Sequence, residues 1–196
     1  MLVTAQTRAE AEWLIRQMRE HDFGGSILEV GSHMGGFLAF MAYNCNPKTA
    51  KIRSVDLTTL YGLGGTIKSL KADGYDAEVY KGNSTSAEAV AWAKENGPYD
   101  FVFIDGDHTY EGVLADWRNY GPLGRWVGFH DIKEADHGYG TVQLWEELKD
   151  KYPSMEIGLA GNWNGIGLLK MPSPAKPYIH QNIGKVSFAL REGGTN

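Results

Sequence analysis

Short strand-like segments that end at or next to a glycine or aspartate alternate along this chain with segments of helical periodicity. The clearest are SILEV (26–30), KIRSVDL (51–57), DAEVYKG (76–82) and YDFVFIDG (99–106), and a helix-like stretch follows each of them. Apolar runs of this length, bounded by turn residues, are typical of strands that are buried on both faces. Strands alternating with helices predict an α/β fold, in which a largely parallel sheet lies between two layers of helices.

The rest of the chain extends this pattern. Further strands are expected at 125–132, 154–160 and 165–170, and helices at 7–20, 35–45, 66–74, 86–97, 110–120 and 141–150. Thr7 followed by Glu10 is the pattern of a capping box at the start of the first helix. Only residues 161–164 separate the last two strands. A parallel pair needs a much longer crossover, so these two strands should be antiparallel.

Length and composition favour one globular domain. The chain has 196 residues, of which 42% are hydrophobic, and we expect a single domain over 1–196 with a core at 24–170. The net charge is −5 and no run of Lys or Arg occurs, which makes nucleic acid an improbable partner. The C-terminal extension, 171–196, is expected to add a strand near KVSFAL or to make a contact in a homo-oligomer.

Cysteine usage and hydropathy bear on the compartment. Cys45 is the only cysteine, so an intrachain disulfide is excluded, and its apolar surroundings read as the end of a buried helix. The first 20 residues carry charges too early for a signal peptide and look like an amphipathic helix. No apolar stretch approaches the roughly 20 residues of a membrane span. We therefore expect a cytoplasmic protein without a membrane partner.

The first predicted strand ends in a glycine-rich turn, EVGSHMGG. Gly31 lets the chain leave the strand sharply, and Gly35 and Gly36 let the backbone approach a ligand at the start of the next helix. His33 stands where a dinucleotide-binding fingerprint has its second glycine, and its bulk argues against a pyrophosphate there. The alternative is a tight strand-to-helix turn that binds nothing.

Acidic residues accompany this turn. Asp56 closes the second strand, where a carboxylate is well placed to accept both hydroxyls of a ribose, although aspartate is also common in turns. Glu29 lies two residues before the turn and could bind an ammonium group. Together these residues favour a nucleoside ligand that carries an amino acid.

The densest group of chemical side chains follows the fourth and fifth predicted strands. FIDGDHTYEGVLAD contains Asp105 and His108, and GFHD contains His130 and Asp131. Adjacent parallel strands bring these four side chains into one crevice, as metal ligands or as acid–base pairs. The alternative for Asp107 is helix capping, which the neighbouring helix at 110–120 favours.

The loop at 133–140 directly follows these residues and is a candidate substrate lid. Tyr139 and Trp163 could stack on a ring of the ligand, and the alternative for each is ordinary packing.

The motifs ILEVGSHMGG, SVD, FIDGDHTYEGVLAD and GFHD resemble class I S-adenosylmethionine-dependent methyltransferases over about residues 24–170. Within that class the chain is most similar to macrolide-sugar O-methyltransferases and cephalosporin-hydroxylase-like proteins. The resemblance implies a Rossmann-like three-layer sandwich whose seven-stranded, mostly parallel sheet has an antiparallel last strand. It also implies O-methylation of a small hydroxylated acceptor, sugar-like or a natural product.

The resemblance assigns roles to individual positions. Glu29, Gly31 and Ser32 would contact the methionine part of the cofactor, Asp56 the ribose, and Asn83 and Ser84 the adenine. The full expected cofactor set is Glu29, Gly31, Ser32, His33, Gly35, Asp56, Leu57, Asn83, Ser84 and Asp105. Asp105, His130 and Asp131 would hold Mg²⁺ or Mn²⁺, and His108, three residues after Asp105, stands where catechol-type relatives have their base. His108, Asp105 and His130 form the expected catalytic set.

Two departures from the family pattern leave alternatives open. His130 replaces an acidic ligand of metal-dependent relatives, and since magnesium prefers oxygen ligands, this favours manganese or zinc, or no metal. Gly124-Arg125 stands where relatives often have two glycines. The rival functions are a metal- or nicotinamide-dependent enzyme on the same scaffold and a non-catalytic nucleoside-binding protein.

Overall fold

Seven strands form one sheet in the computed structural model of the protein, which describes residues 6–58, 62–133, 138–158 and 165–172. The strands are β1 (Ser26–Val30), β2 (Lys51–Asp56), β3 (Asp76–Lys81), β4 (Tyr99–Ile104), β5 (Gly124–His130), β6 (Ser154–Ile157) and β7 (Ile166–Lys170). Their order is β3-β2-β1-β4-β5-β7-β6, and the first five in that order are parallel. β7 is antiparallel to both β5 and β6, which confirms the predicted sheet.

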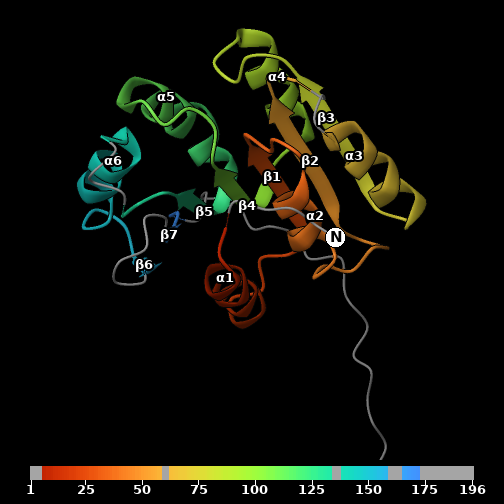
Figure 1. Ribbon diagram of the computed structural model, residues 1–196, viewed down its shortest axis with the longest axis horizontal. Helices are drawn as coiled ribbons and strands as arrows, with labels where there is room; N and C mark the ends of the chain where they lie inside the picture. Colours follow the sequence, from red (N-terminus) through yellow and green to blue (C-terminus); the bar gives the residue numbers. More distant parts are fainter. Residues whose placement is uncertain (1–5, 59–61, 134–137, 159–164, 173–196) are drawn as a thin grey trace, which may run out of the picture.

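Helices cover both faces of the sheet. They are α1 (Arg8–Glu20), α2 (Gly36–Ala42), α3 (Leu63–Ala72), α4 (Ala87–Asn96), α5 (Tyr110–Tyr120) and α6 (Gly140–Leu148), with a short 3₁₀ helix, η2 (Gly121–Leu123), after α5. Buried side chains of α1, α2 and α3 form one hydrophobic cluster with the sheet, and those of α4, α5 and α6 form the other. Figure 1 shows α1 and α2 on one side of the sheet and α5 and α6 on the other. The predicted three layers are confirmed.

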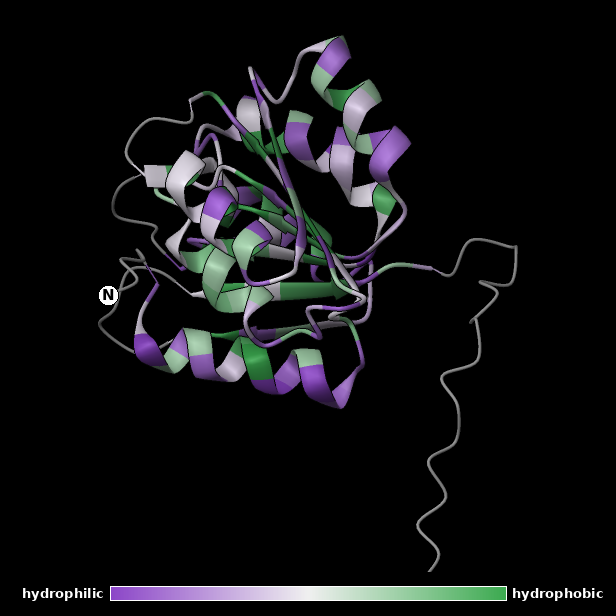
Figure 2. Cartoon of the chain, turned by 90° about the vertical axis from the view of Figure 1, so that its right-hand side faces the viewer, coloured by the Kyte–Doolittle hydropathy of each residue, from purple (hydrophilic) through white to green (hydrophobic). Residues whose placement is uncertain are grey.

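The central strand β4 contributes buried side chains to both hydrophobic clusters. Phe101 and Phe103 point to the cluster of α1 and α2, while Val102 and Ile104 point to the cluster of α5 and α6. Figure 2 shows hydrophobic residues concentrated along the strands and hydrophilic ones on the outer sides of the helices. Burying each of these large side chains contributes about 1.5–3 kcal/mol. A strand with both faces in the core must be apolar at nearly every position, as the sequence of β4 is.

Helix ends follow their capping residues. The predicted capping box at Thr7 and Glu10 is present, and Ser86 caps α4. α2 ends at Ala42, earlier than predicted, so Cys45 lies in a turn after the helix instead of at its end. Burial raises the pKa of the half-buried Cys45 thiol to about 12, which makes it unreactive. α3 begins at Leu63, before the predicted start, because two glycines in its first turn do not prevent a helix that buries Leu63, Ile67 and Leu70.

The topology places a crevice between β1 and β4. The chain runs from β1 outward to β2 and β3 and then crosses back to β4 and β5. The loops after β1 and β4 therefore diverge, and ligands of open α/β sheets bind where this happens, beyond the carboxyl ends of the strands. Within the part of the chain that the structure describes, no helix has the length and apolar character needed to cross a membrane.

Candidate active site

The turn between β1 and α2 requires glycine at two positions. Gly31 has φ +83°, and a Cβ there would lie 2.3 Å from the backbone oxygen of Asp105. The turn after β1 therefore lies directly against the end of β4, and only glycine allows this contact. Gly35 has φ +77° and faces α3, where a Cβ would lie 2.9 Å from the side chain of Leu63. Its neighbour Gly36 lines a cavity.

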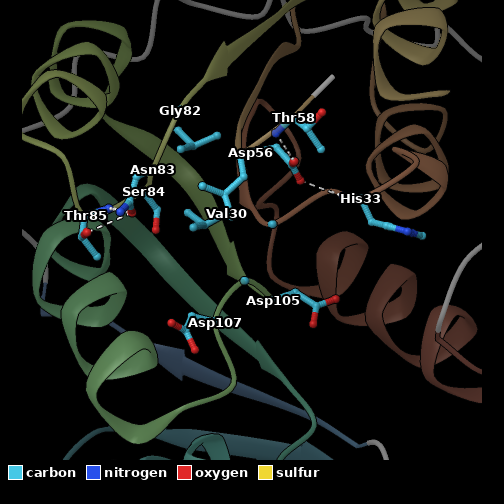
Figure 3. A pocket seen from close by; sticks show the side chains of 14 residues that line it. Val30, His33, Asp56, Thr58, Gly82, Asn83, Ser84, Thr85, Asp105 and Asp107 are labelled. Atoms are coloured by element: carbon cyan, nitrogen blue, oxygen red, sulfur yellow. Dashed lines mark hydrogen bonds between the residues drawn. The ribbon is translucent and has the colours of Figure 1, made fainter. Parts of the chain in front are cut away.

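Asp56 fixes the conformation of this turn. Its Oδ2 accepts hydrogen bonds from the backbone N–H groups of Ser32 and His33, each at 2.8 Å. Its Oδ1 accepts from the backbone N–H of Thr58 at 2.9 Å (Figure 3). The predicted ribose-binding carboxylate is thus also the residue that holds the backbone of the turn. His33, with φ +50°, adopts a left-handed conformation that is unfavourable for a residue with a side chain.

Two cavities meet at this turn. The larger, of about 490 Å³, lies beyond the ends of β1, β2 and β4 (Figure 3). It is lined by Val30, Gly31, His33, Val55, Asp56, Leu57, Thr58, Gly82, Asn83, Ser84, Thr85, Asp105, Gly106 and Asp107. The smaller, of about 300 Å³, shares Gly31, His33, Asp105 and Gly106 with it and adds Gln6, Glu29, Ser32, Met34, Gly36, Phe37 and His108. The shared residues place the two cavities side by side, and we refer to them together as the cleft.

The predicted cofactor residues are distributed over this cleft. Asp56, Leu57, Asn83 and Ser84 line the larger cavity, and Leu57 is 71% exposed, which is unusual for leucine. Figure 3 shows Asn83, Ser84 and Thr85 across the cavity from His33. The larger cavity thus has a polar loop at one end and an exposed apolar side chain beside it.

Glu29 is the most deeply buried acid of the cleft. It is 1% exposed and lines the smaller cavity, and its Oε2 has no hydrogen-bond partner among the described residues. Burial raises the pKa of Glu29 to about 8 despite the opposing contact with Ser32. An unpaired buried carboxylate is unfavourable unless a cation joins it. The smaller cavity therefore favours a positively charged ligand group next to Glu29.

The four predicted Asp and His side chains converge. His130 Nδ1 lies 3.3 Å from Asp105 Oδ1 and 3.2 Å from Asp131 Oδ1. His108 Nε2 lies 3.3 Å from Asp131 Oδ2 and 3.6 Å from Asp105 Oδ1. Each imidazole is thus shared between the same two carboxylates. We call these four residues the Asp–His cluster.

The carboxylates of the Asp–His cluster favour the protonated, positively charged form of its two histidines. Burial disfavours the charged form of His130, but the two carboxylates outweigh it and raise its pKa to about 10. The nearby Asp105 carboxylate raises the pKa of His108 as well. Asp131 has φ +58°, so the cluster is built on a locally unfavourable backbone.

A metal could be held by part of this cluster. Ligand atoms of Asp105, His108 and Asp131 all lie within 4.8 Å of one another. The sequence prediction named His130 in place of His108. The structure brings both imidazoles to the two carboxylates, and it is His108 that completes the convergent group.

Three contacts of the Asp–His cluster were not predicted from the sequence. Gln6 donates a hydrogen bond from Nε2 to Asp105 Oδ2 at 2.8 Å, although 99 positions separate the two residues. The ring of Tyr139, considered above for stacking on a ligand, lies on the ring of His108 with 4.6 Å between centroids. The backbone N–H of Gly140 also donates to the His108 carbonyl at 2.8 Å. No sequence pattern signals the Gln6 contact.

The predicted helix cap needs correction, and some of the predicted residues lie outside the candidate site or outside the described residues. The cap of α5 is Thr109, whose side chain accepts from the Gly112 N–H, and Asp107 instead accepts from the Thr109 N–H at 2.8 Å. Arg125 lies in β5, with Nε 3.6 Å from Asp100 Oδ1. Trp163, residues 134–137 of the suggested lid and most of the C-terminal extension lie outside the described residues.

The matched family places this site in context. A family model described as a methyltransferase domain matches residues 28–132. The chain belongs to this methyltransferase family. The matched residues run from β1 past Asp131 and so include the turn after β1, Asp56, the loop at 82–85 and the whole Asp–His cluster.

One curated relative matches part of this methyltransferase. An uncharacterized protein of Sinorhizobium fredii, y4gI, is 35% identical over 78 residues. These residues make up 38% of the methyltransferase but only 8% of that protein, so the chain spans less than a tenth of its length.

Solved structures share the fold of the methyltransferase at low sequence identity. An O-methyltransferase of Bacillus cereus in complex with S-adenosylhomocysteine (SAH) is 16% identical, with a TM-score of 0.66 and coverage of 87% of this chain and 84% of that one. TomG of Streptomyces achromogenes, an O-methyltransferase of tomaymycin synthesis bound to S-adenosylmethionine (SAM), is 16% identical, with a TM-score of 0.64 and coverage of 86% and 82%. MycE, from the mycinamycin pathway and bound to Mg and SAH, is 15% identical, with a TM-score of 0.58 and coverage of 81% and 48%. These likenesses establish a common architecture.

Proposed function

We propose that this methyltransferase uses SAM to methylate a hydroxyl group of a small acceptor, sugar-like or a natural product. Glu29 carries the proposal. One oxygen of its buried carboxyl group, Oε2, lacks a hydrogen-bond partner in the described structure, and Glu29 lines a cavity where a cation would stabilise its charged form. The ammonium group of a SAM methionine is such a cation, and few other nucleoside ligands have one.

The shape of the cleft supports the same ligand. The larger cavity, with Asp56 and the loop at 82–85, fits a nucleoside, while the smaller one, with Glu29 and Ser32, fits an amino acid. Asp56 would bind the ribose, and Leu57 would pack on the base. The methyl group would then lie near Asp105 and His108, which line the smaller cavity.

The reaction would be a direct displacement. The acceptor oxygen forms a bond to the methyl carbon while the carbon–sulfur bond breaks, and the sulfonium becomes the neutral thioether of SAH. The acceptor proton passes to the His108 imidazole, and the carboxylates of Asp105 and Asp131 beside it stabilise the positive charge that forms. The protein contributes mainly by alignment, which can lower a barrier by several kcal/mol.

A divalent cation fits the Asp–His cluster. The ligand atoms of Asp105, His108 and Asp131 converge within 4.8 Å, and two carboxylates with an imidazole suit manganese or zinc better than magnesium. When bound, the metal would supply a positive charge that acidifies an acceptor hydroxyl. His108 cannot be a metal ligand and the base at once, so in a metal-bound enzyme in which His108 is the base, His130 would replace it as ligand.

Calorimetric titration tests the cofactor. We expect SAM and SAH to bind with dissociation constants in the micromolar range, and Glu29→Gln to weaken both by about tenfold or more. Glu111→Gln, an exposed change on α5, is the matched control. A wild-type protein that binds neither compound, with or without manganese, would overturn the proposal.

Variants of the two histidines test their roles. As the base, His108→Ala should lower turnover by about 10²-fold or more while SAH affinity stays nearly unchanged. A parallel loss of turnover and SAH affinity would contradict that role. Titration of Mn²⁺ into His108→Ala and His130→Ala then identifies the metal ligand, since the variant that loses the ligand loses manganese affinity.

A further inference from the structure

Gln6 reaches the Asp–His cluster from the segment that precedes α1. Its side chain is buried and lines the smaller cavity together with Asp105 and His108. Its Nε2 donates a hydrogen bond to Asp105 Oδ2 at 2.8 Å. An ionised carboxylate only accepts hydrogen bonds, so the amide has to present its NH₂ group to Asp105. The reaction proposed above gives this contact no role.

The two oxygens of Asp105 have different partners. Oδ2 accepts from Gln6, while Oδ1 lies 3.3 Å from His130 Nδ1 and 3.6 Å from His108 Nε2. The torsion that turns a carboxylate about its Cβ–Cγ bond is soft, and turning it would take Oδ1 away from the two imidazoles. The hydrogen bond from Gln6 opposes this rotation. It therefore keeps Oδ1 on the side where the ligand atoms of the cluster converge.

The first turn of α1 holds Gln6 in place. Gln6 directly precedes Thr7, the N-cap of α1, and the buried Glu10 completes the capping box through its Oε2. The other oxygen of Glu10, Oε1, accepts the backbone N–H of Gly165, which directly precedes β7. The start of α1 is thus fixed to the sheet beside β5. A side chain held on such a preformed turn is suited to orient another side chain.

The absence of charge on Gln6 suits a site that binds a cation. A lysine or arginine at this position would form an ion pair with Asp105 and offset the negative charge that attracts a metal. An amide orients the carboxylate and leaves its charge in place. Hydrogen bonds to the carboxylate ligands of metals commonly have this function, and loss of one typically lowers metal affinity by about 10–100-fold.

We infer that Gln6 is a positioning residue that keeps Asp105 Oδ1 directed at a divalent cation in the Asp–His cluster. Asp131 and one of the two histidines complete the ligand set, and Gln6 acts only through Asp105. The inference rests on the metal site of the proposed function.

The test uses Mn²⁺ alone, titrated into the full chain and followed by the electron paramagnetic resonance signal of the free ion. We expect the wild type to bind Mn²⁺ without SAM or acceptor, and Asp105→Ala to lose this binding. Gln6→Met keeps a side chain of similar length but removes the donor, and it should weaken Mn²⁺ binding by about tenfold or more. Gln17→Met is the matched control, because Gln17 lies on α1 and both glutamines are 8% exposed.

Two further measurements separate orientation of Asp105 from general support of the cavity. Gln6→Met should keep SAH affinity within about threefold of wild type, because the cofactor contacts assigned to Glu29 and Asp56 remain. Gln6→Lys restores a donor but adds a positive charge, so it should weaken Mn²⁺ binding at least as much as Gln6→Met.

The outcomes distinguish this inference from the proposed function. Equal Mn²⁺ affinity in wild type and folded Gln6→Met would overturn the role of Gln6, as would a wild type that binds SAH but no Mn²⁺. Similar losses of Mn²⁺ and SAH affinity in Gln6→Met would also overturn it, since they indicate damage to the whole cavity. A wild type that binds Mn²⁺ but neither SAM nor SAH would overturn the cofactor assignment, and the Gln6→Met comparison would still decide the role of Gln6. Gln6→Ala gives the same comparison if Gln6→Met does not fold.

Discussion

The Asp56 carboxylate accepts the backbone N–H of His33 at 2.8 Å, so the end of β2 holds the turn that follows β1. A carboxylate oxygen has more than one lone-pair site, and Asp56 can therefore hold the turn and still receive a ligand hydroxyl. In the proposed complex, this dual contact would couple the conformation of the turn to occupation of the cleft.

Asp56→Ala should affect both stability and binding. It removes the acceptor for three backbone N–H groups, those of Ser32, His33 and Thr58. We expect a loss of about 1–3 kcal/mol in the free energy of unfolding and at least about a tenfold loss of SAH affinity. Urea denaturation and calorimetry measure the two effects. Asp150→Ala, at an exposed position, is the control, and an Asp56→Ala variant that keeps wild-type affinity would contradict the assignment.

Substitutions at His33 separate its backbone role from its side chain. Its φ of +50° is accessible to glycine but strongly disfavoured for β-branched residues. His33→Gly should leave stability within about 1 kcal/mol, because relief of the backbone conformation offsets the entropy of glycine. His33→Val should cost about 1–3 kcal/mol.

The SAH affinity of His33→Gly shows whether the imidazole of His33 contacts the ligand. The N–H that donates to Asp56 is still present in His33→Gly, so SAH affinity should stay within about threefold of wild type. A loss of tenfold or more would show that the imidazole itself contacts the ligand.

Ligand binding should release a proton from Glu29. Because burial raises its pKa to about 8, most of the free protein carries a protonated Glu29 at pH 7. A ligand ammonium lowers this pKa, so binding at pH 7 should release close to one proton, and much less at pH 9. The dependence of the binding enthalpy on the ionisation enthalpy of the buffer gives the number. Glu29→Gln should abolish this release, and equal release by both proteins would contradict the assignment.

Much of the fold follows from patterns that local chemistry imposes. Thr7 and Glu10 predict the start of α1, and the short connection before β7 predicts its antiparallel pairing, because both depend on neighbours in sequence. The Asp–His cluster was predictable from the order of the strands in the sheet. Asp105 and His130 lie at the ends of strands that are adjacent in the sheet.

The missed features depend on contacts between distant residues. Nothing near Gln6 in the sequence indicates that it will contact Asp105. Asp116, which is fully buried, did carry a signal, because it falls within the apolar stripe that includes Val113, Trp117 and Tyr120 on α5. A carboxylate at such a position is unfavourable for stability.

Asp116→Asn should therefore make the protein more stable at alkaline pH. Burial raises the pKa of Asp116 from 3.8 to about 6, so the folded state binds the proton more tightly than the unfolded state. The resulting penalty is absent below pH 3.8, grows as the pH rises toward 6 and is complete above it, at up to about 3 kcal/mol. Asparagine cannot ionise, so its gain in unfolding free energy should be largest at pH 8 and should shrink toward pH 4.

Urea denaturation at several pH values measures this gain, with Glu111→Gln as the exposed control on the same helix. A gain at pH 8 that shrinks toward pH 4 would mean that the buried charge lowers the stability of the folded protein. If Asp116→Asn were instead less stable than wild type at pH 8, the carboxylate would be making stabilising hydrogen bonds in the folded protein.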